Sequence, residues 1–255
     1  MEHYYTEKQT SPLRIKEIKV VLRGNTLQFY TGSGVFSIGK VDKGSEVLIE
    51  NCLIKEGDNV LDLGCGYGAV GIAIAKAFPS AFVRMADINM RAIMLSKRNA
   101  KLNNIRNVEI TQGNVYGGIE GKFNAILINP PQSAGRELCF EMIEKAKDYL
   151  KKNGLLQLVA RHNKGGKELE KKMNIIFGNV KEIAKKGGYR IYVSELIYPF
   201  YSITLTPSLV KATNLIPKPN CNKAEIIAIC SLPSPETMFK ATSRSVIFPS
   251  NDFFI

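Results

Sequence analysis

The chain has 255 residues, of which 45% are hydrophobic and 23% charged, so it is long enough to bury a substantial core. No run approaches the roughly 18 apolar residues of a membrane-spanning helix, and residues 1–12 are polar, which predicts a cytoplasmic protein. Its net charge of +12 predicts attraction of polyanions such as nucleic acids. The five cysteines lack CxxC spacing, which indicates reduced thiols and no metal site.

A hairpin is predicted on either side of a central region of alternating strands and helices. A short helix over residues 45–54 is predicted after the first hairpin. Gly24-Asn25 separates residues 18–23 from 26–31, and a Lys-Lys-Gly-Gly run separates residues 180–184 from 189–196. Between them, short apolar runs alternate with segments whose apolar residues recur every three or four positions. The predicted strands are 59–65, 83–88, 108–112, 123–129 and 154–160, and the predicted helices are 69–78, 90–103, 135–152 and 165–177. This order is typical of an α/β fold with a parallel sheet between helices on both faces.

The carboxy-terminal part has a different composition. Residues 196–255 contain no glycine but 7 of the 11 prolines, and they carry only 5 Lys or Arg and 3 Asp or Glu, so most of the basic excess lies before them. We therefore expect three parts: a flexible N-terminus over 1–15, a catalytic domain over 16–195, and a Pro-rich extension over 196–255 for which the sequence predicts no fold.

A glycine-rich turn predicts a nucleotide-like cofactor. Residues 60–71 run from a predicted strand into a predicted helix and include Gly64, Gly66 and Gly68, which permit tight turns and close approach of a ligand. The run also fits the GxGxxG pattern, so a dinucleotide and S-adenosylmethionine are the alternatives. Asp62 favours the second, because a carboxylate there attracts a methionyl ammonium group and repels a pyrophosphate. At the end of the next strand, Asp87 is expected to accept hydrogen bonds from both ribose hydroxyls, which either cofactor has.

Four further residues complete the predicted cofactor site. Asn114 is placed to accept from the adenine amine and Val115 to donate through its backbone, although a simple polar turn is the alternative interpretation. Ile88, which follows Asp87, is also expected to contact the cofactor. Phe36 is expected over the cofactor or the base, although a core position would suit it equally.

The segment Asn129-Pro130-Pro131 is the most specific signal. It ends the fourth strand at the carboxyl edge of the sheet, where open α/β folds bind ligands. Two prolines remove two donors, which leaves the Pro130 carbonyl free to converge with the Asn129 side-chain oxygen. Two acceptors of this kind bind both hydrogens of a planar NH2 group and turn its delocalised lone pair toward a methyl donor. We therefore predict catalytic roles for Asn129 and Pro130, with Asn129 also contacting the cofactor.

Residues 16–195 resemble the small-domain ribosomal RNA guanine-N2 methyltransferases and their archaeal relatives, within the class I S-adenosylmethionine-dependent enzymes. The resemblance rests on residues 34–37 (GVFS), 42–45 (DKGS), 62–68 (DLGCGYG), 86–92 (ADINMRA), 129–131 (NPP) and 186–190 (KGGYR). It implies a Rossmann-like, seven-stranded, mainly parallel sheet with one antiparallel strand, S-adenosyl-L-methionine as donor, and methylation of an exocyclic amine in ribosomal RNA. Two positions depart from the family pattern: Gln132 stands where an aromatic residue often stacks on the flipped base, and Asn114 where Asp is usual.

The expected substrate side is basic. Pro131 and Gln132 are predicted at the base, and Arg161, His162 and Lys164 are predicted to grip the RNA backbone, because they follow the fifth strand at the same sheet edge. A methyltransferase acting on a protein glutamine amide and a catalytically silent RNA-binding module remain as alternatives. The positive charge disfavours the first, and the intact motifs disfavour the second.

Overall fold

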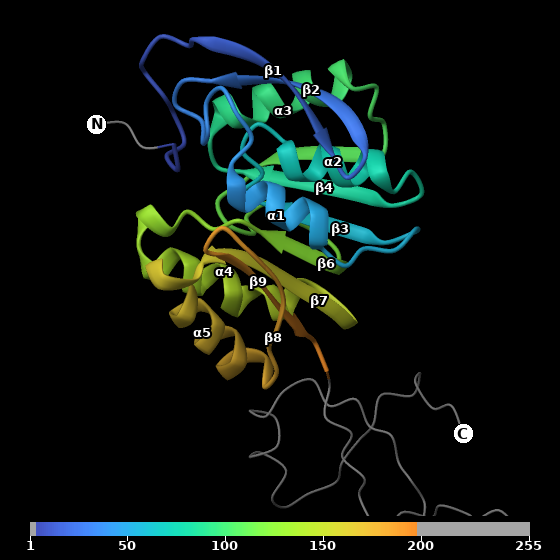
Figure 1. The fold of residues 1–255 in the computed structure, drawn as a ribbon, viewed down its shortest axis with the longest axis vertical. Coiled ribbons are helices and arrows are strands. Elements are labelled where there is room, and N and C mark those ends of the chain that lie inside the picture. Colours follow the sequence, from blue (N-terminus) through green and yellow to red (C-terminus); the bar gives the residue numbers. More distant parts are fainter. Residues whose placement is uncertain (1–3, 198–255) are drawn as a thin grey trace, which may run out of the picture. The chain divides into compact units, whose positions relative to one another are not determined.

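A seven-stranded sheet forms the centre of residues 4–197, the part of the chain that the computed structural model describes (Figure 1). The strand order is β5-β4-β3-β6-β7-β9-β8, and every neighbouring pair from β5 to β7 is parallel. The strands are β3 (Asn59–Leu63), β4 (Phe82–Asp87), β5 (Val108–Gln112), β6 (Phe123–Ile128), β7 (Leu150–Arg161), β8 (Lys181–Lys186) and β9 (Tyr189–Glu195). Because β9 is antiparallel to both β7 and β8, it is the one reversed strand, which confirms the predicted fold class.

Helices cover both faces of the sheet (Figure 1). The helices α1 (Lys43–Asn51), α2 (Ala69–Ala77) and α3 (Met90–Leu102) pack on one face, and α4 (Arg136–Tyr149) and α5 (Lys167–Phe177) on the other. The sheet therefore contributes side chains to two hydrophobic cores, one on each face. In β3, for example, Val60 packs on the α1–α3 side, whereas Leu61 and Leu63 pack on the α4–α5 side. This explains why the strands read as continuous apolar runs.

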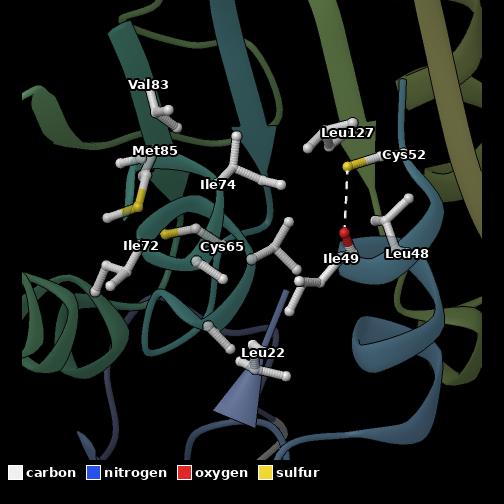
Figure 2. Packing of buried hydrophobic residues seen from close by; sticks show 14 of the residues in the cluster. Leu22, Leu48, Ile49, Cys52, Cys65, Ile72, Ile74, Val83, Met85 and Leu127 are labelled. Carbon is white, nitrogen blue, oxygen red and sulfur yellow. Dashed lines mark hydrogen bonds between the residues drawn. The ribbon is translucent and has the colours of Figure 1, made fainter. Parts of the chain in front are cut away.

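The first core brings together residues far apart in the sequence. Figure 2 shows Ile72 and Ile74 of α2 beside Val83 and Met85 of β4, all of them fully buried. Each such side chain stabilises the fold by about 1.5–3 kcal/mol relative to an exposed position. Helix α2 approaches β4 closely because residue 71 is glycine, where an added Cβ would lie 2.2 Å from the Met85 sulfur.

An amino-terminal hairpin of β1 (Ile15–Leu22) and β2 (Asn25–Gly32) packs over α2 and α3 (Figure 1). Its turn lies at Arg23-Gly24, one residue earlier than predicted. Both residues have positive φ, 50° and 74°, as a tight two-residue hairpin turn requires. The later hairpin turns at Gly187-Gly188 and joins β8 to β9, as predicted.

Some predicted boundaries are wrong by several residues. The helix predicted over 135–152 ends at Tyr149, because Leu150 has extended backbone angles and pairs with Phe123. The β7 strand consequently begins four residues before the predicted start at 154. It continues past Asn153, whose φ is 60°, through a register shift against β6. Helix α1 begins at Lys43, not at residue 45, because Asp42 caps it.

Other parts of the prediction fall outside these elements. Residues 4–14 contact the folded chain: Met90 N donates to Glu7 O and Ser33 N to Arg14 O, both at 3.0 Å. The flexibility of 1–15 and the domain boundaries stay predictions, and residues 198–255 of the extension lie outside the described residues. Within the described range, no helix is long and apolar enough to cross a membrane, and no group of side chains is suited to hold a metal ion.

Candidate functional site

A cavity lies at the carboxyl ends of β3, β4 and β6, the edge of the sheet at which open α/β folds bind their ligands. Four of its walls follow strands: the glycine turn, the end of β4, the loop after β5 and the Asn-Pro-Pro segment. Leu138 and Met142 of α4 also line it, and so do residues of the amino-terminal part, among them Tyr4 and Phe36. Phe36 thus lines the cavity and is partly exposed, so it does not take the core position that the sequence equally allowed; its contact with the cofactor or the base stays a prediction.

The glycine turn holds Asp87 in the wall of this cavity. Gly66 N donates to one carboxylate oxygen of Asp87 and Asn89 N to the other, each at 2.8 Å. These bonds fix the carboxylate, and burial raises its pKa despite them. Gly64, Gly66 and Ile88 also line the cavity. A Cβ added at Gly66 would meet no atom within 4 Å, so the glycine leaves open space beside the Asp87 carboxylate.

Two predicted cofactor residues do not line the cavity. Asp62 is only 3% exposed, and its Oδ2 accepts from Gly71 N at 2.8 Å. Its position therefore does not support the predicted contact with an ammonium group, because the carboxylate points at the backbone of α2. Gly68 caps α2 with a φ of 92°, and a Cβ there would lie 2.9 Å from Ile72 Cδ1. Both residues shape the turn without reaching the cavity.

The loop after β5 is tightly folded where it meets the cavity. Asn114 and Val115 both line it, and their predicted contacts with adenine stay predictions. Gly117 N donates to Asn114 O at 2.8 Å, and a Cβ at Gly113 would lie 1.9 Å from Gly117 O, so only glycine fits there. Val115 has a φ of 52°, which is rare for a β-branched residue and costs about 1–3 kcal/mol. The surrounding turn holds this strained backbone at the cavity wall.

The side-chain amide of Asn129 has a fixed orientation. Its Nδ2 donates to Asp42 Oδ2 at 3.1 Å and to Ser45 Oγ at 2.9 Å. Its Oδ1 makes none of the hydrogen bonds found among the described residues, and Asn129 lines the cavity. The predicted acceptor role of Asn129 is therefore compatible with its surroundings. The two partners were not predicted, although the DKGS run that contains them was noted.

The prediction that Pro130 O is free of donors is wrong. Gln132 N donates to it at 2.8 Å, because Pro131, at φ −75° and ψ 76°, closes an inverse γ-turn. The two prolines lack backbone N–H groups of their own, but the N–H of the following residue, Gln132, turns back to the Pro130 carbonyl. A carbonyl oxygen has two lone pairs, so Pro130 O retains one for a ligand. Pro130 and Pro131 both line the cavity.

The other predicted substrate residues lie beside the cavity, not in its wall. The Gln132 side chain links the two loops, donating to Lys164 O at 2.8 Å and accepting from Arg161 N at 3.4 Å. Arg161 is exposed, with its guanidinium 5.4 Å from the centre of the Tyr189 ring. His162 Nδ1 is 2.7 Å from the Tyr192 hydroxyl. Arg161 and Lys164 are exposed and form a rim beside the loop that carries Gln132, whereas Gln132 and His162 are half-buried.

Tyr4 is a site residue that the sequence did not reveal. Its ring lies 5.1 Å from that of Phe36, its hydroxyl is 3.0 Å from Ser133 Oγ, and its carbonyl accepts from Asn89 Nδ2 at 2.9 Å. Tyr4 thus connects both sides of the cavity and lines it together with Tyr5. The one signal for it is a pair of aromatic residues within the polar run of residues 1–12.

Comparisons with known proteins agree with this architecture. The sequence over residues 26–193 matches the methyltransferase small domain. The uncharacterized protein YbxB of Bacillus subtilis (strain 168) is 36% identical over 77% of this chain and 99% of its own length. Ribosomal RNA small subunit methyltransferase C of Haemophilus influenzae (strain PittGG) is 33% identical over 65% of this chain and 50% of its own length. The chain thus spans about half the length of that relative.

Solved structures share the fold. The Thermus thermophilus 16S rRNA N2 methyltransferase RsmC, in complex with AdoMet and guanosine, has a TM-score of 0.62 at 23% identity, covering 74% of this chain and 53% of its own. A methyltransferase from Pyrococcus furiosus has a TM-score of 0.51 at 24% identity, covering 57% and 78%. At these identities the likeness concerns the fold alone. The match over residues 26–193 covers more than half of the sequence, and the chain therefore belongs to the methyltransferase small-domain family.

Proposed function

We propose that this chain is an S-adenosylmethionine-dependent methyltransferase that acts on an exocyclic amine of RNA, with guanine N2 in small-subunit ribosomal RNA as the target. The observation that carries the proposal is the oriented amide of Asn129, which leaves its Oδ1 as an acceptor in a cavity that also holds the Asp87 carboxylate. An acceptor beside a site for a nucleoside is the arrangement that methylation of a planar amine requires.

The residues of the cavity fit S-adenosyl-L-methionine. Asp87 offers both carboxylate oxygens to ribose hydroxyls, since each oxygen has a lone pair beyond the one used by a backbone N–H. Asn114 and Val115 line the cavity and would meet the adenine ring, and Phe36 and Ile88 would cover the cofactor as apolar neighbours. The open space at Gly66 leaves room for the ligand beside Asp87. When bound, the cofactor supplies an electrophilic methyl group on a positively charged sulfur.

Asn129 and Pro130 prepare the nitrogen for transfer. The lone pair of a base amine is delocalised into the ring, which makes the nitrogen a poor nucleophile. Asn129 Oδ1 and the remaining lone pair of Pro130 O accept its two hydrogens and so orient the lone pair away from the ring plane. A preorganised polar contact of this kind contributes on the order of 3 kcal/mol to barrier reduction, and alignment in a dry pocket contributes the rest. The proton passes to a neighbour or to water after transfer, so no general base is needed.

RNA is the proposed substrate for three reasons. The net charge of +12 attracts a polyanion, and Arg161 and Lys164 are exposed on the rim beside the loop that carries Gln132. Relatives that match most of the folded part of this chain are named as ribosomal RNA methyltransferases. Pro131 and Gln132 would then contact the base, and Arg161, His162 and Lys164 the backbone. A protein acting on ribosomal RNA or on a ribosomal particle would work in the cytoplasm.

Replacement of the proposed acceptor tests the function. We expect Asn129→Ala to retain its affinity for S-adenosylmethionine, measured by calorimetry, and to lose on the order of 100-fold in methyl transfer. The assay offers donor labelled in its methyl group to ribosomal RNA, to small-subunit particles and to a glutamine-containing release factor.

The other outcomes identify the alternatives. Label in the release factor alone would make this a protein glutamine methyltransferase, and label in none would make it a silent cofactor-binding module. Asp87→Ala is the matched control, because it should weaken cofactor affinity first. An Asn129→Ala enzyme with most of its activity would refute the mechanism.

A further inference from the structure

We propose that Asp42 and Ser45 are positioning residues that fix the Asn129 amide with its oxygen toward the substrate. The proposal rests on the function above and extends it to two residues outside the Asn-Pro-Pro segment. They lie 87 and 84 positions before Asn129 in the chain, yet both receive hydrogen bonds from its Nδ2.

Orientation matters because a side-chain amide has two nearly isosteric ends of opposite character. The oxygen accepts hydrogen bonds, whereas the NH2 group donates two. If Asn129 were rotated by half a turn, its NH2 group would face the amine of the base, and two sets of hydrogens would oppose each other. The catalytic acceptor would then be lost without any change of sequence.

The partners of Asn129 permit one orientation. An ionised carboxylate only accepts hydrogen bonds, so Asp42 Oδ2 attracts the NH2 end of Asn129 and repels its oxygen. Ser45 Oγ accepts the second hydrogen at 2.9 Å, and Ser45 is 7% exposed, so water competes little for this bond. With both Nδ2 hydrogens engaged, Oδ1 is left on the side of the cavity.

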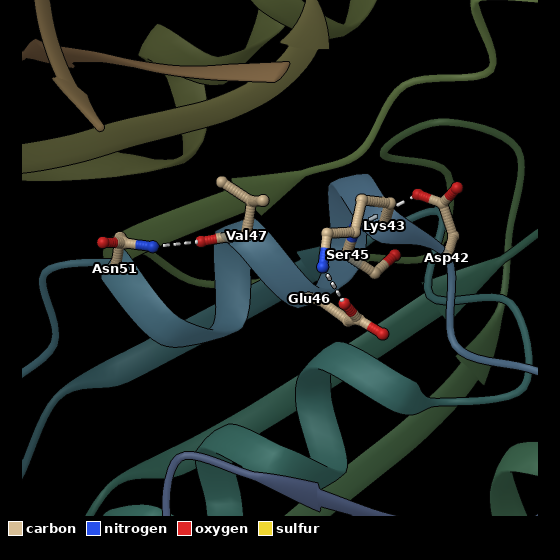
Figure 3. Close-up of polar contacts among 6 residues, drawn as sticks. All are labelled: Asp42, Lys43, Ser45, Glu46, Val47 and Asn51. Carbon is tan, nitrogen blue, oxygen red and sulfur yellow. Dashed lines mark hydrogen bonds and ion pairs between the residues drawn. The ribbon is translucent and has the colours of Figure 1, made fainter. Parts of the chain in front are cut away.

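Helix α1 holds these two partners in place. Asp42 is its N-cap, and the same Oδ2 accepts from Ser45 N at 3.1 Å; Figure 3 shows Asp42 and Ser45 together at the start of the helix. A Cβ at Gly44 would lie 2.9 Å from Asp42 Oδ2 and 2.9 Å from Tyr189 Cε1. A side chain at position 44 would therefore crowd both the Asp42 carboxylate and the Tyr189 ring, and glycine leaves the carboxylate its room.

Substitutions in α1 test the proposal. We expect Ser45→Ala to lower kcat about tenfold with unchanged KM for RNA and unchanged cofactor affinity, because the Asn129 amide then keeps only its hydrogen bond to Asp42 and is held less firmly. Asp42→Ala should lower kcat further. Asp42→Asn should restore kcat to within about threefold, since an asparagine oxygen can cap the helix and accept from Nδ2. Asn51→Ala is the matched control: it removes the hydrogen bond to Val47 O in the same helix (Figure 3) and should leave kcat unchanged.

Two further measurements separate positioning from folding. In the Asn129→Ala background, Ser45→Ala should have no additional effect on kcat, because the group it orients is absent. In ¹⁵N-labelled wild-type protein, the Asn129 side-chain amide should exchange its hydrogens slowly, and Ser45→Ala should accelerate this exchange whether or not RNA is methylated. Equal effects of Ser45→Ala in both backgrounds, or unchanged exchange, would overturn the proposal. A wild-type enzyme that methylates no RNA would instead refute the proposed function.

Discussion

The carboxyl group of Asp62 is the most strongly perturbed acid of the glycine turn. It is buried and accepts one hydrogen bond, from Gly71 N. Burial raises its pKa to about 7 from 3.8, and the single N–H bond opposes this shift without cancelling it. The Asp62 carboxyl group thus accepts a hydrogen bond from α2, and its burial makes it difficult to ionise.

This raised pKa predicts a dependence of stability on pH. The folded state binds the proton of Asp62 more tightly than the unfolded chain does, so its contribution to stability is fully present below pH 4 and is lost as the pH rises through about 7. Each unit of pKa difference corresponds to about 1.4 kcal/mol. We expect the free energy of unfolding, measured in urea from pH 5 to pH 8, to fall with pH. It should fall less in Asp62→Asn, whose amide oxygen still accepts from Gly71 N. Equal slopes in the two proteins would contradict this assignment.

The amino-terminal segment contributes to the site although residues 4–14, its described part before β1, contain no helix or strand. Tyr4 spans the cavity between Phe36 and Ser133, and its backbone is tied to Asn89. An aromatic ring buries up to 150–250 Å² and so adds much contact area at little cost in conformational entropy. The segment therefore adds aromatic surface to one side of the cavity.

Substitution of Tyr4 tests this role. We expect Tyr4→Ala to weaken S-adenosylmethionine binding about tenfold, because an apolar wall of the cavity is removed. Tyr4→Phe should bind as the wild type does, since the hydroxyl contacts only the exposed Ser133. Calorimetric titration of the three proteins measures the difference. If Tyr4→Phe were as weak as Tyr4→Ala, the hydrogen bond to Ser133 would matter and not the ring.

The sequence predicted the elements better than the contacts between them. Parallel strands, the glycine turn and Asn129 follow from local patterns, because apolar periodicity and glycine spacing are written in neighbouring residues. The hydrogen bonds from Asn129 to Asp42 and Ser45 join segments more than 80 residues apart, and no local pattern encodes them. The engaged carbonyl of Pro130 depends on the backbone angles of Pro131, which a pair of prolines leaves open.

At the scale of the molecule, charge decides how the site meets its substrate. The excess of 35 Lys and Arg over 23 Asp and Glu produces a general attraction for RNA, which by itself does not orient it. Several cations are paired, as Arg84 is with Glu109 and Lys145 with Glu141. The exposed Arg161 lies at the cavity rim, beside the loop that carries Asn129. Direct phosphate contacts are therefore expected at the rim, whereas the other cations contribute only to the general electrostatic attraction of RNA.

The salt dependence of RNA binding distinguishes a direct contact with a phosphate from a general attraction by the net charge of the protein. The affinity for RNA falls as the salt concentration rises, because each phosphate contact releases a counterion. Each contact makes the negative slope of log affinity against log salt concentration steeper by about 0.7–0.9. We expect Arg161→Ala to reduce this slope by about that amount, in equilibrium titrations of a ribosomal RNA fragment. Lys145→Ala removes the same unit of charge from an ion pair on α4 and should leave the slope unchanged. Equal reductions in both variants would mean that the net charge alone holds the RNA, and that Arg161 does not direct it toward Asn129.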